Sequence, residues 1–151
     1  MTDSHKRIRK NCICISILLL AGAGLVLYLV LSGYEPSGGD IWGHLYKSQE
    51  MYESLKKGNV FPLFSPYWYN GIQLFRYWGP LSYYIMAGLM FLTGGDLLLA
   101  YRLLAFVIFV VGGLPWILWG IHENRRVLGT FFGLLWFFMP EHIRIYFTAG
   151  N

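Results

Sequence analysis

Charged residues are scarce in this chain of 151 residues. Asp, Glu, Lys and Arg together make up 13% of it, against about 25% in an ordinary soluble domain. The hydrophobic residues, 56% of the total, are gathered in long blocks. Such blocks are typical of helices that cross a bilayer, because about 20 apolar residues are needed to span the hydrocarbon core. The composition therefore predicts an all-α integral membrane protein.

Several functional signatures are also missing. The two cysteines, Cys12 and Cys14, lack the further cysteine and histidine partners of a zinc site, so we interpret them as apolar helix residues or, alternatively, as palmitoylation sites. No P-loop, dinucleotide-binding glycine motif, HExxH or GxSxG sequence is present. The net charge is +4, but basic residues do not interleave with aromatic ones as they do on an RNA-binding surface. We therefore expect no nucleic-acid partner.

The first hydrophobic block predicts an uncleaved membrane anchor. Residues 1–10 form a basic tail and residues 11–32 the first span. The apolar run is longer than the roughly 7–15 residues of a signal peptide, and no A-x-A cleavage site follows it. Basic flanks stay on the cytoplasmic side, so we expect a plasma-membrane protein with a cytoplasmic N-terminus and with residues 33–96 outside. The basic residues of the tail are Lys6, Arg7, Arg9 and Lys10.

Two shorter helices are predicted within residues 33–96. An amphipathic helix over 40–57 has one apolar face, formed by Ile41, Leu45, Ser48, Tyr52 and Leu55 at helical spacing. We expect Asp40, His44, Lys47 and Ser54 on or near the opposite face. The apolar segment 80–92 has thirteen residues, about 20 Å of helix, which is short for a span. We interpret it as an extracytoplasmic juxtamembrane helix.

The remaining chain predicts two more spans. Residues 97–121 form the second span, 122–126 a cytoplasmic loop, 127–147 the third span and 148–151 an extracytoplasmic end. In the alternative topology, residues 80–92 also cross the membrane and the protein has four spans. That alternative places Arg125 and Arg126 outside, against the tendency of basic loops to remain cytoplasmic.

Asp40 is the first candidate for a chemical role. A carboxylate beside the bilayer can act as a general base on a hydroxyl, or bind a divalent ion such as Mg²⁺ or Mn²⁺. An Asp at the start of a helix is also a common N-cap, and the two roles are compatible. His44 follows one turn later on the same side of the helix, so it is a candidate acid–base group or a partner that orients Asp40.

Further candidates lie near the same expected membrane face. Arg102 near the outer end of the second span either contacts a lipid phosphate or extends to the interface. A polar cluster near the end of the third span either completes a site with Asp40 or marks the end of that helix. Tyr77 and Trp78 are expected to contribute to substrate binding. The polar cluster comprises Glu141, His142 and Arg144.

These positions, taken in order, resemble a known family. The pattern comprises Asp40 with His44 and the segments 58–62 (Gly-Asn-Val-Phe-Pro), 66–68 (Pro-Tyr-Trp), 70–71 (Asn-Gly) and 77–84 (Tyr-Trp-Gly-Pro-Leu-Ser-Tyr-Tyr). It resembles the bacterial and archaeal multi-pass proteins called 6-pyruvoyl-tetrahydropterin synthase-related membrane proteins. These are in turn similar to glycosyltransferases of the GT-C type.

The resemblance covers residues 37–151 and implies a function. In GT-C enzymes a polyprenyl-phosphate sugar is the donor, and an acid in the first outer loop is catalytic or binds metal; Asp40 occupies that acid's position. The Pro80 helix resembles the juxtamembrane helix before the second span, and Arg102 with Leu103 resembles the Arg-Leu pair that often opens that span. Two features depart from the pattern. Trp78 and Gly79 replace the more usual Tyr-Pro or Lys-Pro, and GT-C enzymes have many more spans.

We therefore expect the N-terminal part of a multi-pass glycosyltransferase that transfers sugar at the extracytoplasmic face. The expected partners are membrane lipid and a polyprenyl-phosphate sugar, and the chain alone is expected to be inactive. The rival hypothesis is a non-enzymatic membrane protein, such as part of a transporter or an assembly factor for surface polymers.

The three-span topology predicts which positions an impermeant thiol reagent reaches in intact cells. In a background without Cys12 and Cys14, cysteines at Ser37 and Thr93 should be labelled from outside, whereas one at Asn124 should be labelled only after the membrane is opened. Protection at Thr93 together with labelling at Asn124 would instead establish the four-span topology.

Overall fold

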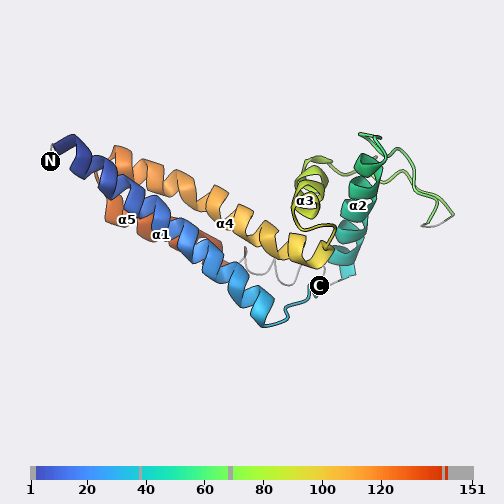
Figure 1. Cartoon of the computed structure of the whole chain (residues 1–151), viewed down its shortest axis with the longest axis horizontal. Coiled ribbons are helices and arrows are strands. Elements are labelled where there is room, and N and C mark those ends of the chain that lie inside the picture. The colour runs from blue at the N-terminus through green and yellow to red at the C-terminus, as the bar shows by residue number, and fades with distance from the viewer. Residues whose placement is uncertain (1–2, 38, 68–69, 141, 143–151) are drawn as a thin grey trace. The chain divides into compact units, whose positions relative to one another are not determined.

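The structure is a computed structural model that describes residues 3–37, 39–67, 70–140 and 142. The helices, shown in Figure 1, are α1 (Asp3–Leu31), α2 (Gly39–Lys56), α3 (Leu81–Leu92), α4 (Leu97–His122) and α5 (Arg126–Leu135), followed by a short 3₁₀ turn η1 (Trp136–Phe138). Among these residues β pairing is confined to an isolated antiparallel bridge between Ser65 and Ile72. The all-α class is therefore confirmed.

The chain divides into two compact units. The first holds α1, α5, η1 and the part of α4 from Ala105 onward, and the second holds α2, α3 and the part of α4 up to Leu104. Among the described residues two helices are long and apolar enough to cross a bilayer, with 28 residues in Ser4–Leu31 and 26 in Leu97–His122. At 1.5 Å per residue each is about 40 Å long, which exceeds the roughly 30 Å of the hydrocarbon core. The helix α1 also includes most of the expected basic tail.

The segment expected as a third continuous helix over 127–147 takes another form in its described part. α5 begins at Arg126 and gives way to η1 after Leu135, and Met139 is extended, with φ −59° and ψ 134°. Pro140 explains this ending, because the proline ring disfavours helical geometry at the preceding residue. Residues 141 and 143–147 lie outside the described part of the chain.

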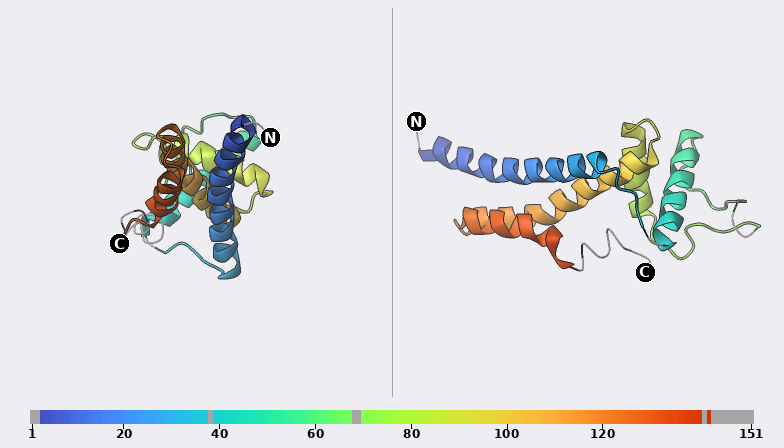
Figure 2. Two further views of the ribbon diagram at one scale, coloured as in Figure 1. Left: turned by 90° about the vertical axis from the view of Figure 1, so that its left-hand side faces the viewer. Right: turned by 90° about the horizontal axis from the view of Figure 1, so that it is seen from below.

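Glycines allow the helices of the first unit to pack closely. α5 runs back along α4 after a turn in which Asn124 has φ 59° (Figure 2). A β-carbon added at Gly129 would lie 2.6 Å from the carbonyl oxygen of Trp116, and one at Gly133 would lie 2.8 Å from that of Gly113. Such distances are too short for any side chain, so the two backbones are in direct contact. Gly129 and Gly133 form the G-x-x-x-G spacing that is common where membrane helices pack.

The other contacts of the first unit involve aromatic rings. The indole nitrogen of Trp136 donates a hydrogen bond to the carbonyl oxygen of Phe109 at 3.0 Å, and Gly112 leaves room for that ring. Gly22 of α1 faces Phe106 and Phe109. α1 also packs along α5. The three helices therefore form one bundle in which small residues are placed opposite large ones.

In the second unit α2 packs against α3. The expected face of α2 is buried at Ile41, Leu45, Ser48 and Tyr52, and α3 buries Tyr83, Met86, Ala87 and Met90 against it. The expected polar face was only partly right, because Lys47 and Ser54 are buried as well. Ser54 donates to the carbonyl oxygen of Asn59 at 2.8 Å, which helps to end α2 at a left-handed Gly58 with φ 78°.

A tight turn joins α3 to α4. Gly94 and Gly95 have φ values of 70° and 96°, in the left-handed region that glycine adopts without strain. The carboxylate of Asp96 accepts a hydrogen bond from the backbone nitrogen of Leu99 at 2.9 Å and so caps α4.

The glycine contacts between α4 and α5 predict large effects from small substitutions. Gly129→Ala and Gly133→Ala should each lower the free energy of unfolding by about 1–3 kcal/mol, because an added methyl group forces the two backbones apart. Gly24→Ala in α1 is the matched control, since no atom lies within 4 Å of its added β-carbon. Unfolding in detergent micelles titrated with a denaturing detergent measures all three. Equal stability of Gly24→Ala and Gly129→Ala would contradict the packing.

Candidate functional site

The second unit contains a polar cavity at the start of α2. Its volume is about 450 Å³, and its lining combines ionisable and aromatic side chains from α2 and from the segment between α2 and α3. The lining residues are Asp40, Trp42, Gly43, His44, Tyr46, Lys47, Tyr67 and Trp78. Two of the predicted site residues, Asp40 and His44, therefore line one cavity together with Trp78.

The helical repeat explains why three ionisable groups gather here. Asp40, His44 and Lys47 are spaced four and three residues apart, which places them along one face of α2. α2 begins at Gly39, so Asp40 lies within the first turn of the helix. Its exposed carboxylate is stabilised there by the positive end of the helix dipole.

His44 is held by aromatic partners on two sides. Its Nδ1 atom forms a 2.8 Å hydrogen bond with the hydroxyl of Tyr83, and its ring meets the Trp78 ring edge-on with 4.9 Å between centroids. Partial burial lowers the pKa of His44, nearby Lys47 lowers it further, and Asp40 opposes both effects. Burial raises the pKa of Tyr83. At neutral pH the pair is therefore an uncharged imidazole bonded to a protonated phenol.

Lys47 lies beneath the aromatic segment instead of facing solvent. The residue is 8% exposed, and its Nζ atom lies 4.5 Å from the centre of a Trp78 ring. A cation over an indole face is attracted by the ring quadrupole, which offsets part of the cost of burial. Burial lowers the pKa of Lys47, and Asp40 opposes that shift. Lys47 thus brings a partly desolvated positive charge to the cavity wall.

Tyr77 is separated from the main cavity by its neighbour Trp78. Tyr77 is 81% exposed and lines a second, smaller cavity of about 280 Å³, where Arg76 lies 5.3 Å from its ring. Lys47 and Trp78 line both cavities. The two expected aromatic residues therefore belong to adjoining cavities that share one cation and one indole ring.

Ser65 anchors the loop that carries Tyr67 to the cavity. Ser65 is fully buried, pairs with Ile72 through two 2.9 Å backbone hydrogen bonds, and bonds through its hydroxyl to that of Tyr46. At Gly71, with φ 122°, an added β-carbon would lie 2.0 Å from the ring of Phe64. The loop therefore depends on Gly71, both for its backbone conformation and for the space that Phe64 fills.

The other predicted site residues that the structure describes are not among those that line this cavity. Arg102 lies in the first turns of α4 in the second unit, is half-buried and has interaction partners. His142 belongs to the first unit, where its Nδ1 atom lies 2.7 Å from the carbonyl oxygen of Trp136. Glu141 and Arg144 lie outside the described residues. Their part in a site with Asp40 stays a prediction.

The donor set does not fit a divalent metal ion in the part of the chain that the structure describes. No group of three His, Cys, Asp or Glu side chains gathers there. Asp40 and His44 line the cavity together with the Lys47 ammonium, whose charge repels a cation.

Sequence reasoning missed Lys47, Tyr46, Tyr67 and Tyr83 as parts of the site. Lys47 had a usable signal, because it lies three residues after His44 and seven after Asp40. Tyr67 and Tyr83 had none, since Tyr67 reaches α2 through the loop between α2 and α3, and Tyr83 through the packing of α3 against α2.

Comparison with known proteins gives one match. Residues 75–151 match the model of a membrane protein family described as the 6-pyruvoyl-tetrahydropterin synthase related domain. No curated protein and no solved structure matches the chain. The matched region includes Trp78 and Tyr83 of the site, whereas Asp40, His44 and Lys47 precede it.

The lowered pKa of His44 predicts an acid-sensitive second unit. The unfolded chain binds a proton at His44 at higher pH than the folded chain does, so stability is full above the ordinary histidine pKa of about 6.5 and falls as the pH drops below it. His44→Gln should reduce this loss, whereas His122→Gln, at the exposed end of α4, should not. Thermal unfolding in detergent at pH 8 and pH 5.5 measures both. An identical pH dependence in the two variants would contradict the prediction.

Proposed function

Since the chain belongs to the family of membrane proteins with a 6-pyruvoyl-tetrahydropterin synthase related domain, we propose that it forms part of a site for sugar transfer from a polyprenyl-phosphate carrier. The observation that carries this proposal is the cavity of the second unit, where a carboxylate, an uncharged imidazole, an ammonium group and an indole ring converge. Its volume of about 450 Å³ lies within the range of small-molecule sites.

Each of these groups has a task in glycosyl transfer. The exposed face of Trp78 offers an apolar surface for the C–H groups of a sugar ring. Lys47 balances the charge of the phosphate, which grows as the carrier departs. Asp40 accepts the proton of the acceptor hydroxyl. The acceptor oxygen forms a bond to the anomeric carbon, the bond from that carbon to the phosphate oxygen breaks, and the polyprenyl phosphate leaves with the electron pair.

His44 supports this arrangement as a positioning residue. It lies one helical turn from Asp40, and its bond to Tyr83 fixes the imidazole plane. Its edge-on contact with Trp78 in turn holds the indole over Lys47. An uncharged imidazole at this point leaves the carboxylate of Asp40 free to act as the base. Loss of His44 is therefore expected to weaken substrate binding as well as turnover.

The second candidate is a membrane protein that binds the same lipid-linked sugar without transferring it. The burial of Lys47 under Trp78 favours this candidate as a binding site, because sugar and phosphate recognition need only the ring and the cation. The two candidates differ at Asp40. Binding alone does not require its charge, whereas transfer does.

Replacement of the Asp40 charge tests the proposal. Asp40→Asn keeps the size of the side chain and its favourable place near the helix start, and should lower transfer by about 10²–10⁴-fold through loss of the general base. The assay uses membranes that contain the protein and polyprenyl-phosphate carriers bearing radiolabelled glucose, galactose or mannose. Asp96→Asn is the matched control, because asparagine still caps α4 and the charge lost is elsewhere.

Three results are distinguishable. Loss of transfer in Asp40→Asn but not in Asp96→Asn supports the enzyme. Full activity in Asp40→Asn removes the proposed base. Binding of a labelled carrier that Lys47→Met and Trp78→Leu abolish, with no turnover in the unaltered protein, favours the non-enzymatic candidate.

A further inference from the structure

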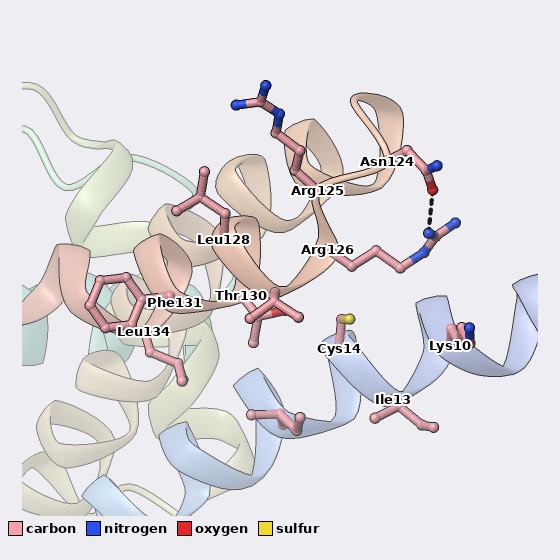
Figure 3. Close-up of a pocket in the computed structure, with 12 residues that line it drawn as sticks. Lys10, Ile13, Cys14, Asn124, Arg125, Arg126, Leu128, Thr130, Phe131 and Leu134 are labelled. Carbon is pink, nitrogen blue, oxygen red and sulfur yellow. Dashed lines mark hydrogen bonds between the residues drawn. The ribbon is translucent and has the colours of Figure 1, made fainter.

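A groove of the first unit contains a cluster of basic residues that the sugar-transfer proposal does not use. The groove lies between the N-terminal half of α1 and the start of α5, and its volume is about 880 Å³ (Figure 3). It is polar at one end and apolar elsewhere. The lining residues are Lys10, Ile13, Cys14, Ile17, Asn124, Arg125, Arg126, Val127, Leu128, Thr130, Phe131 and Leu134.

The polar end of the groove carries positive charge that no acidic residue in the lining balances. Lys10 and Arg126 lie at the same end, while Arg125 points away from it (Figure 3). The guanidinium of Arg126 donates from Nε to the amide oxygen of Asn11 at 2.7 Å and from a terminal nitrogen to that of Asn124 at 2.6 Å. Both partners are neutral. They fix the direction of Arg126 without cancelling its charge.

The rest of the groove is lined by apolar side chains, which suit a hydrocarbon chain. Ile13 and Ile17 of α1 are 48% and 41% exposed, and Phe131 of α5 is 54% exposed. These side chains continue from the basic end along the direction of the helices. Since α1 is apolar and long enough to cross a bilayer, this surface is suited to contact with lipid tails. The charged end of the groove matches the phosphate of a phospholipid headgroup, and the apolar part of the groove matches an acyl chain.

Thr130 provides a separate observation at the same place. It is 9% exposed, lines the groove, and its hydroxyl has no hydrogen-bond partner among the described residues. A buried hydroxyl without a partner costs about 1–3 kcal/mol. An ester oxygen near the headgroup of a bound lipid is an acceptor that would satisfy it.

We propose that this groove binds one anionic phospholipid, with its phosphate between Lys10 and Arg126 and one acyl chain along α1 and α5. Basic pockets between membrane helices, near the interface, are the usual sites for anionic headgroups. The groove opens at the basic end of α1, so the lipid belongs to the leaflet that holds this end. The binding is independent of the cavity of the second unit and of any sugar transfer there.

Spin-labelled lipids provide the test. The protein is reconstituted in phosphatidylcholine vesicles that contain a trace of either spin-labelled phosphatidylglycerol or spin-labelled phosphatidylcholine, and the motionally restricted fraction is measured. The unaltered protein should retain phosphatidylglycerol preferentially. Lys10→Gln and Arg126→Gln should each reduce that preference about fivefold, as expected for one basic group near a charged headgroup.

Three further variants distinguish the effect of the charge at the groove from the effects of the shape of the groove and of the stability of the protein. Arg9→Gln removes the same charge from the same helix outside the groove lining and should leave the preference unchanged. Arg126→Lys keeps the charge and should retain most of the preference, which guards against simple loss of folding in Arg126→Gln. Thr130→Val should lower the retention of both lipids by a similar factor, because an ester oxygen is common to both.

Four results would overturn the proposal. The first is that the unaltered protein retains the two lipids equally, and the second is that Arg9→Gln and Lys10→Gln have equal effects. The third is that millimolar inorganic phosphate displaces the labelled lipid. The fourth is that both lipids are excluded. Displacement by phosphate would indicate a free anion site. Exclusion of both lipids would indicate that a second copy of the chain fills the groove.

Discussion

A hydrocarbon solvent offers no hydrogen bonds, and α1 and α4 are long and apolar enough to cross such a solvent. Every backbone N–H and C=O group that crosses the bilayer must be satisfied within the protein, and a helix does this within its own segment. Lipid tails are as apolar as leucine, so apolar surface alone does not bring such helices together. Two such helices come close only where their surfaces fit together. Glycine has no side chain to hold the helices apart, and the backbones of α4 and α5 are in contact at Gly113, Gly120, Gly129 and Gly133.

In the described part of the chain, the second unit is held together by buried side chains and not by contacts between glycines. α2 has too many polar groups to cross a bilayer, and it is held against α3 by buried apolar and aromatic side chains. Its polar face is then available for a cavity. The same aromatic segment that covers Lys47 also supplies the walls around His44, so the packing of this segment and the geometry of the site are inseparable.

The sequence predicted the elements better than the contacts between them. The predicted helices 40–57 and 80–92 agree with α2 and α3 to within one residue at each end. The apolar run predicted a third span over 127–147, whereas in its described part α5 ends at Leu135 and Met139, which precedes Pro140, is extended. Asp40 was predicted from its place after the first apolar block and His44 from its spacing to Asp40, and both line the cavity. Lys47 was assigned to solvent because nothing local indicates that Trp78, 31 positions later, lies over it.

The sharing of Lys47 by two adjoining cavities has an electrostatic consequence. One ammonium group at a common wall can neutralise one anion well, but not two. A phosphate held in the larger cavity would therefore weaken the attraction of a second anion to the smaller one, and the reverse would hold to the same extent. The four-carbon stem of the lysine lets the charge shift towards whichever side is filled. Arg76 gives the smaller cavity a cation of its own, so an anion in one cavity would weaken the binding of an anion in the other without preventing it.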